Sequence, residues 1–234
     1  MAKKSISHKD DIKREFNFTT HSIISQVLRG VLVGIFAGLV VGIFRFLIEK
    51  IFHLVQDVYH RSQQSLLWLL SLVLLYCFIV LLNARLVNSE KNIKGSGIPQ
   101  VEAELKGLMS LSWWSVLWKK FVLGILAISS GLMLGREGPS IQLGAMSGKG
   151  VSKFLNLSAA EERALIASGA AAGLAAAFNA PIAGLLFVVE EVYRHFSRFF
   201  WVSTLAASLV ANFVSLSMFG LTPVLDMPDN IPVM

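Results

Sequence analysis

The chain has 234 residues, of which 54% are hydrophobic and 15% are charged, and its formal net charge is +6. Because soluble domains carry about 25% charged residues, this composition excludes an ordinary soluble protein and indicates an integral membrane protein with several spans. The single cysteine, Cys77, lies in an apolar run, which excludes a disulfide framework and a cysteine-based metal site. We therefore expect no metal and no cofactor.

The N-terminal segment, residues 1–20, is polar and charged and lacks the apolar core of a secretory signal peptide. Six of the 21 Lys and Arg residues lie within the first 29 positions, whereas three lie between residues 45 and 61. Since cytoplasmic segments carry the excess of basic residues, this asymmetry predicts a cytoplasmic N-terminal tail on a multi-pass protein of the inner (plasma) membrane. The positive charge therefore indicates membrane topology and not a nucleic-acid partner.

Residues 23–48 form the first predicted membrane helix. Four glycines recur in this helix at a spacing of four: Gly30, Gly34, Gly38 and Gly42. This spacing lines one helical face with small residues, which lets another helix backbone approach closely. We expect the stripe to pack inside the bundle rather than to bind a ligand.

A polar connection is predicted over residues 49–64, a second span over residues 66–82 and a charged loop over residues 83–94. The next helix is preceded by aromatic and basic residues that are typical of a membrane interface: Trp113, Trp114, Trp118, Lys119 and Lys120. The uncharged run that follows, residues 121–134, rises only about 21 Å, less than a hydrocarbon core of ~30 Å. We therefore expect this helix to end within the membrane.

The later spans are also interrupted. Ser158 and Glu161 form a capping-box pattern that opens a helix, and the uncharged run 164–189 that follows is broken by Asn-Ala-Pro at residues 179–181. A last span is predicted over residues 199–221. Irregular backbone at membrane depth is tolerated only inside protein or beside a watery cavity, and transporters use such breaks to direct half-helix ends at a substrate. The sequence thus predicts an all-α polytopic membrane protein with broken helices.

The stretch Gly95-Ser96-Gly97-Ile98-Pro99 has the residues of a helix start. Proline favours the first turn of a helix, and the preceding glycines allow a ligand to approach the backbone N–H groups. Such a start carries partial positive charge and unpaired donors, to which the Ser96 hydroxyl would add one more. Two interpretations stay open: an anion site, or a plain helix start.

The stretch Gly135-Arg136-Glu137-Gly138-Pro139 repeats the pattern, but it places a carboxylate where an anion would bind. An ionisable residue at the centre of a membrane helix costs on the order of 2.5–3.5 kcal/mol, which makes it a functional candidate. Ionised, Glu137 would fill the anion site; protonated, it would leave that site and carry a proton. The alternative is that Arg136 and Glu137 form a buried or interfacial structural pair.

Three other patterns are weaker. Residues 144–150 resemble a phosphate loop, but only three residues separate the first two glycines and Gly150 replaces the metal-binding Ser or Thr. The five histidines lack zincin spacing and no serine lies in a nucleophile elbow, so an enzyme is not expected. Glu190 and Glu191 end the broken run, and residue chemistry alone favours a solvated helix end there.

At these residues the sequence resembles the CLC family of chloride channels and proton-coupled chloride transporters. The matching blocks are GSGIP at 95–99, GREGP at 135–139 and the small-residue segment at 169–191. The resemblance extends over roughly residues 24–220. It implies the first of two inverted repeats, with broken and tilted membrane helices.

The resemblance also implies a role for each matching residue. Ser96 would donate its hydroxyl to chloride within an anion site formed by Gly95, Gly97, Ile98 and Pro99, and the backbone around Arg136 and Gly138 would line the outer anion site. Glu137 would be the gating glutamate that exchanges protons. Glu191, with its neighbour Glu190, would be the internal proton relay that exchangers have and channels usually lack.

The implied function is proton-coupled chloride antiport, with chloride and protons as the transported species. The family's proteins are homodimers in membrane lipid, and their second repeat supplies another helix start and a chloride-coordinating tyrosine. The sequence predicts a tail at 1–20, a first-repeat transmembrane domain at 21–224 and the beginning of a second repeat at 225–234, so we expect half a transporter. The alternatives are a passive voltage-gated-type chloride channel, and a transport-inactive half that needs a complementing C-terminal chain.

Overall fold

The computed structural model describes residues 2–63, 65–193 and 198–220. Every regular element in these ranges is helical, which confirms the all-α prediction. The expected tail at 225–234 lies outside the described residues. The helices are α1 (Ala2–Ser62), α2 (Leu66–Ser89), α3 (Ile98–Leu105), α4 (Trp113–Ser129), α5 (Glu137–Phe154), α6 (Ala159–Phe178), α7 (Pro181–Phe187) and α8 (Arg198–Phe219), with a 3₁₀ turn at Lys91–Ile93 and a π-helical turn at Val188–Tyr193.

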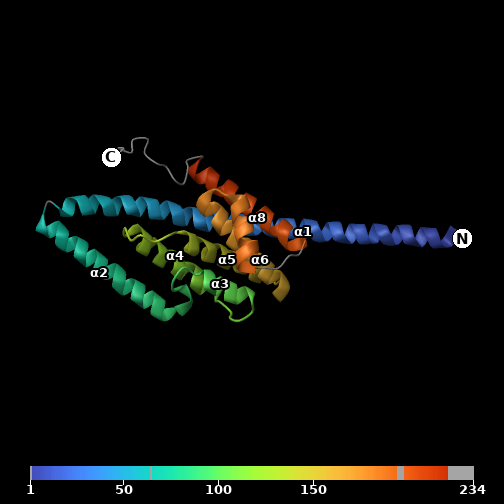
Figure 1. Cartoon of the computed structure of the whole chain (residues 1–234), viewed down its shortest axis with the longest axis horizontal. Helices are drawn as coiled ribbons and strands as arrows, with labels where there is room; N and C mark the ends of the chain where they lie inside the picture. Colours follow the sequence, from blue (N-terminus) through green and yellow to red (C-terminus); the bar gives the residue numbers. More distant parts are fainter. Residues whose placement is uncertain (1, 64, 194–197, 221–234) are drawn as a thin grey trace.

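Helix α1 runs along the longest axis of the molecule, and its N-terminal part extends beyond the other helices (Figure 1). Helix α2 returns along α1 at an angle, and α4, α5, α6 and α8 pack against α1 (Figure 1). Helix α3 packs on α5 and α6, and α7 packs on α6 and α8. Helices α1, α5, α6 and α8 form the centre of the bundle, where α5 packs against α6 and α1 packs against α8. This central packing holds the two short, broken regions at 95–99 and 135–139 in place.

Three helical boundaries differ from the predictions. The prediction of a connection over residues 49–64 is wrong for most of that range, because α1 continues to Ser62. Helix α2 continues to Ser89, through part of the charged loop that was expected over residues 83–94. The segment 2–20 is also helical and is continuous with the first predicted membrane helix. The reason is the same in each case: charged side chains do not end a helix, and these segments contain neither glycine nor proline.

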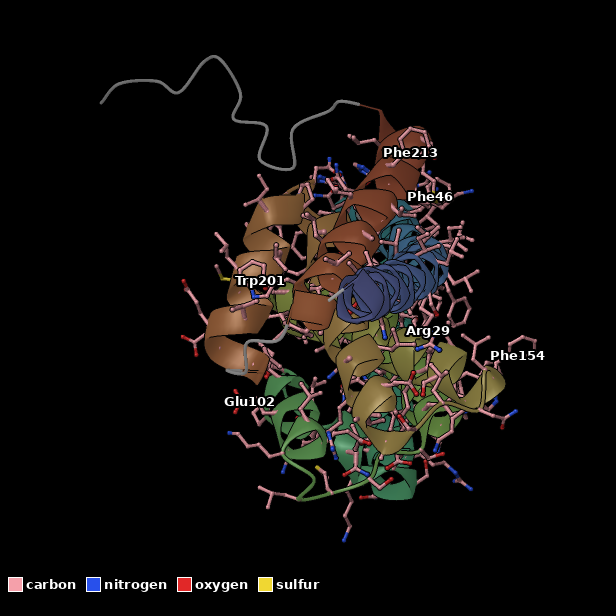
Figure 2. The ribbon with its side chains drawn as sticks, turned by 90° about the vertical axis from the view of Figure 1, so that its right-hand side faces the viewer. Arg29, Phe46, Glu102, Phe154, Trp201 and Phe213 are labelled. Atoms are coloured by element: carbon pink, nitrogen blue, oxygen red, sulfur yellow. The ribbon has the colours of Figure 1, made fainter. Side chains whose placement is uncertain are left out.

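Three helical stretches are long and apolar enough to cross a membrane: Ile23–Ser62 of α1, α2, and Phe200–Phe219 of α8. Large apolar side chains project outwards from the bundle, among them Phe46, Phe154 and Phe213, which are 49%, 86% and 72% exposed (Figure 2). Such a surface suits contact with hydrocarbon rather than with water. Helix α4 ends at Ser129 after 17 residues, about 25 Å, so it is short for a span as predicted.

The glycine stripe of α1 packs directly on the backbone of α8, as predicted. A Cβ at Gly34 would lie 2.6 Å from the carbonyl oxygen of Ala207, and one at Gly38 would lie 2.9 Å from the Cα of Ala211. Real Cβ atoms do not approach other atoms so closely. The two helices can therefore meet at this distance only because these α1 positions lack side chains.

Helices α5 and α6 meet in the same way. The backbones of Gly144 and Gly169 touch, and Gly173 packs against the carbonyl oxygen of Ser140. Residues 144–150 lie inside the continuous helix α5, so they form no phosphate loop. The one lysine of that stretch, Lys149, is buried and forms an ion pair with Glu104.

Both ends of α6 follow the sequence prediction. At its start, the Ser158 hydroxyl accepts from the Glu161 amide, while the Glu161 carboxylate accepts from the Ser158 amide at 3.0 Å, which completes the capping box. At its end, Asn179 takes a left-handed conformation with φ of 56°, and α7 begins two residues later at Pro181. The break at 179–181 is therefore present.

Gly34→Val tests the contact between α1 and α8. The new side chain would force the two helices apart, and such overpacking costs about 1–3 kcal/mol in unfolding free energy. We expect a lower thermal unfolding midpoint in detergent. Leu39→Val, on the exposed side of the same helix, is the control and should leave the midpoint nearly unchanged. An unaltered midpoint for Gly34→Val would contradict the contact.

Acid stability tests the polar start of α6, which lies outside the three spanning stretches. Hydrogen bonds from Ser158, and then from Arg29, lower the pKa of Glu161 from its ordinary 4.5 to about 2. A lowered pKa in the folded state adds stability that is fully present above about pH 4.5 and is lost as the pH falls towards 2. We expect Glu161→Gln to lose less stability than the wild type over this window, measured as the unfolding midpoint against pH. Parallel profiles for the two proteins would rule out this contribution.

Candidate functional site

A cavity of about 540 Å³ lies where α3 and α5 begin, beside the middle of α4. It is lined by residues from both predicted breaks together with α4: Gly95, Ser96, Ile98, Lys120, Glu137 and Gly138 are among them. Two helix N-termini thus border one cavity. Since each carries partial positive charge and unpaired N–H donors, the cavity is suited to an anion.

The start of α3 is fixed by backbone conformation. Gly97, directly before the helix, has φ of +96°, which favours glycine, and its Cα packs against the side chain of Gln142. Pro99 occupies the first turn of the helix. The Ser96 hydroxyl oxygen accepts from the Ile98 amide at 3.4 Å, so the hydroxyl hydrogen stays available for donation.

The start of α5 touches the start of α3. A Cβ at Gly138 would lie 2.6 Å from the carbonyl oxygen of Ser96 and 2.7 Å from its Cβ. The absence of a side chain at this position is what lets the two helix starts meet. Glu137 is the first residue of α5, and its carboxylate folds back against Gly135 on the wall of the cavity.

Lys120 was expected at the membrane interface, and that expectation is wrong. The side chain is 1% exposed and lines the cavity, and its Nζ donates to the carbonyl oxygens of Ile93 at 3.0 Å and Gly95 at 2.7 Å. Lys120 lies on the same face of α4 as Gly124 and Ala127, which also line the cavity. Its neighbour Lys119 lies over the ring of Trp118, as an interfacial lysine would.

Arg136, the basic residue of the break at 135–139, does not form the ion pair with Glu137 that the sequence analysis considered. In the described residues, the ion pair of Arg136 is with Glu49 of α1, at 3.6 Å, and not with Glu137. Glu49 also accepts from Arg45 at 3.0 Å. Arg136 is thus directed away from the lining of the cavity, and Glu137 is left beside the helix starts.

Glu190 and Glu191 lie in the π-helical turn that follows α7. Both side chains are exposed, and neither lines the cavity. The turn packs against α6 and against α3, the helix whose start borders the cavity. The structure therefore brings together Ser96, Glu137 and the starts of α3 and α5. Glu190 and Glu191 lie apart from this cavity.

Comparison with known proteins gives a consistent result. The family model for voltage gated chloride channels matches residues 77–234. The H(+)/Cl(-) exchange transporter ClcA of Vibrio cholerae is 42% identical over 139 residues, which make up 58% of this chain and 30% of the relative. The protein of the same name from Citrobacter koseri is 50% identical over 103 residues, or 44% of this chain and 22% of the relative.

Solved structures share the fold. The crystal structure of a slow cyanobacterial Cl⁻/H⁺ antiporter superimposes with a TM-score of 0.80 at 29% identity, covering 89% of this chain and 50% of that one. A eukaryotic CLC transporter superimposes with a TM-score of 0.66 at 23% identity, covering 82% and 38%, and this likeness concerns the fold alone. The chain spans about 30% of the length of the Vibrio relative and half of the cyanobacterial structure.

Lys120→Met tests the support of the loop before α3. Hydrogen bonds from a charged donor are worth about 1.5–3 kcal/mol each, and this substitution removes two of them. We expect amide hydrogen exchange over residues 93–98 to become about tenfold faster or more, measured by mass spectrometry in detergent. Lys119→Met is the matched control and should not change exchange there. Equal exchange in all three proteins would mean that Lys120 does not hold the loop.

Proposed function

Because the chain belongs to the voltage gated chloride channel (CLC) family, we propose that it forms the anion-binding part of a membrane transporter that exchanges chloride for protons. The relatives reported above are named as exchangers, antiporters or transporters, and none is named as an enzyme. The observation that carries the proposal is the meeting of two helix starts at one cavity, with a hydroxyl, a buried lysine and a carboxylate on its walls.

Chloride would be bound by partial charges and donors rather than by an ion pair. The N–H groups at the starts of α3 and α5 point their dipoles towards the cavity, and Ser96 has a hydroxyl hydrogen to donate. Gly95, Gly97, Ile98 and Pro99 would form one side of the site, and the backbone of Arg136 and Gly138 the other. Lys120 adds positive charge to the cavity wall without contacting a carboxylate there.

Glu137 would couple the two transported ions. An ionised carboxylate on the cavity wall competes with chloride for the same donors, whereas a protonated carboxyl loses that attraction and releases the site. Each exchange of carboxylate for chloride would then move one proton to or from Glu137. This provides coupling without any covalent step, since only the proton and the anion change places.

Glu191, next to Glu190, would pass protons between the solvent and the interior. Its exposed position on the turn that packs against α3 supports a role in proton exchange with water. In this proposal the N-terminus is cytoplasmic, the membrane is the plasma membrane, residues 21–224 form the transmembrane unit, and two copies associate in lipid as a homodimer. A C-terminal portion like that of the relatives would supply the other side of the pathway.

The test is chloride efflux from liposomes with the external pH recorded at the same time. Because the chain aligns with only part of each relative, it is reconstituted alone and also with the remaining portion of the Vibrio cholerae protein. We expect chloride efflux with opposing proton movement. Glu191→Gln should abolish proton movement, and Glu137→Gln should leave chloride flux that no longer depends on pH.

Each other outcome has a distinct meaning. Chloride flux without proton movement in the unmodified protein would indicate a passive channel. Flux that appears only with the added portion would indicate that this chain supplies half of the pathway. Absence of flux in both preparations would reject chloride transport as the function.

A further inference from the structure

A charged cluster joins α1 to the start of α5, next to the candidate site. Glu49 of α1 accepts from Arg45 Nε at 3.0 Å and lies 3.6 Å from Arg136 Nη1. The Arg45 guanidinium also stacks over the ring of Phe219, 4.4 Å from its centroid. The cluster therefore links α1, α5 and α8 at the residue directly before Glu137.

The charges of this cluster do not cancel. It holds two guanidinium groups and one carboxylate, so its formal charge is +1. Arg45 is 5% exposed, and its Nη1 is buried and makes no hydrogen bond within the described residues. Glu49 is the carboxylate that contacts both Arg45 and Arg136, so its replacement by a neutral residue raises the formal charge of the cluster by one unit.

We propose that Glu49 is a positioning residue that holds Arg136 towards α1 and thereby lowers the positive potential that an anion meets at the start of α5. This inference rests on the proposed function, in which chloride and Glu137 share that site. Glu49 does not line the cavity, so it acts through Arg136 and not on the anion directly.

The charges near the site determine whether loss of the Glu49 charge strengthens or weakens chloride binding. Lys120 on α4 and Glu137 on α5 line the cavity, and Arg45, Glu49 and Arg136 form the cluster beside it. Replacing Glu49 by glutamine changes the cluster from +1 to +2 and releases Arg136. Chloride should then bind more tightly, by a small factor, because the Glu49 side chain is 45% exposed and water screens its charge.

The experiment measures chloride binding to the purified full chain by titration calorimetry. All proteins carry Glu137→Gln, because an ionised Glu137 would respond to the same potential and mask the effect. We expect Glu49→Gln to lower the dissociation constant about two- to threefold, and this gain to shrink when sodium gluconate raises the ionic strength. Glu49→Asp keeps the charge and should bind as the parent does.

Glu162→Gln is the matched control. Glu162 pairs with Lys153 at 2.9 Å, at the opposite end of α5, so its loss should leave chloride affinity unchanged. Unchanged affinity in Glu49→Gln would overturn the inference while leaving the proposed function intact. Weaker binding with a lower unfolding midpoint, not rescued by Glu49→Asp, would show a merely structural role and also overturn it. No chloride binding by the parent would reject the proposed function itself.

Discussion

The backbone contact between Gly138 and Ser96 is the constraint on which the site depends. The starts of α3 and α5 touch here, and a side chain at residue 138 would occupy the space of the Ser96 backbone. The loop before α3 is also held by side chains from α4 and α5. Lys120 binds two of its carbonyl oxygens, and the Gln142 amide donates to the carbonyl oxygen of Asn92 at 2.9 Å.

Close packing of small residues fixes the positions of the helices in the bundle relative to one another. Helix α5 is held by α6 at Gly144 and Gly173, and α8 is held by α1 at Gly34. In a membrane the lipid tails are as apolar as the side chains, so helices gain stability from close van der Waals contact rather than from leaving water. Glycine and alanine faces supply that contact. The positions of the helix starts therefore depend on helix packing that extends from Ser140, next to the cavity lining, to the contact between α1 and α8.

The features that could be predicted from the sequence are local ones. Four-residue spacing predicted the packed face of α1, and the pairing of Ser158 with Glu161 predicted the capped start of α6. The contacts that could not be predicted join distant segments: Arg136 to Glu49, and Lys120 to the carbonyl of Ile93. A lysine after three tryptophans is typical of an interface, and only the packing of α4 against α5 shows that its side chain turns inwards.

The two buried lysines, Lys149 and Lys120, differ in the groups that they contact. Lys149 Nζ contacts the Glu104 carboxylate at 2.5 Å and the carbonyl oxygen of Leu111 at 2.7 Å, so its charge is neutralised where it lies. Lys120 contacts two carbonyl oxygens, which accept two of its three N–H groups but carry no net charge. The carboxylate that lines the same cavity is that of Glu137. The lining of the cavity therefore holds one ammonium group and one carboxylate. In the proposed exchange of chloride for protons, the ammonium group of Lys120 would attract the anion, and the Glu137 carboxylate would compete with it for the site.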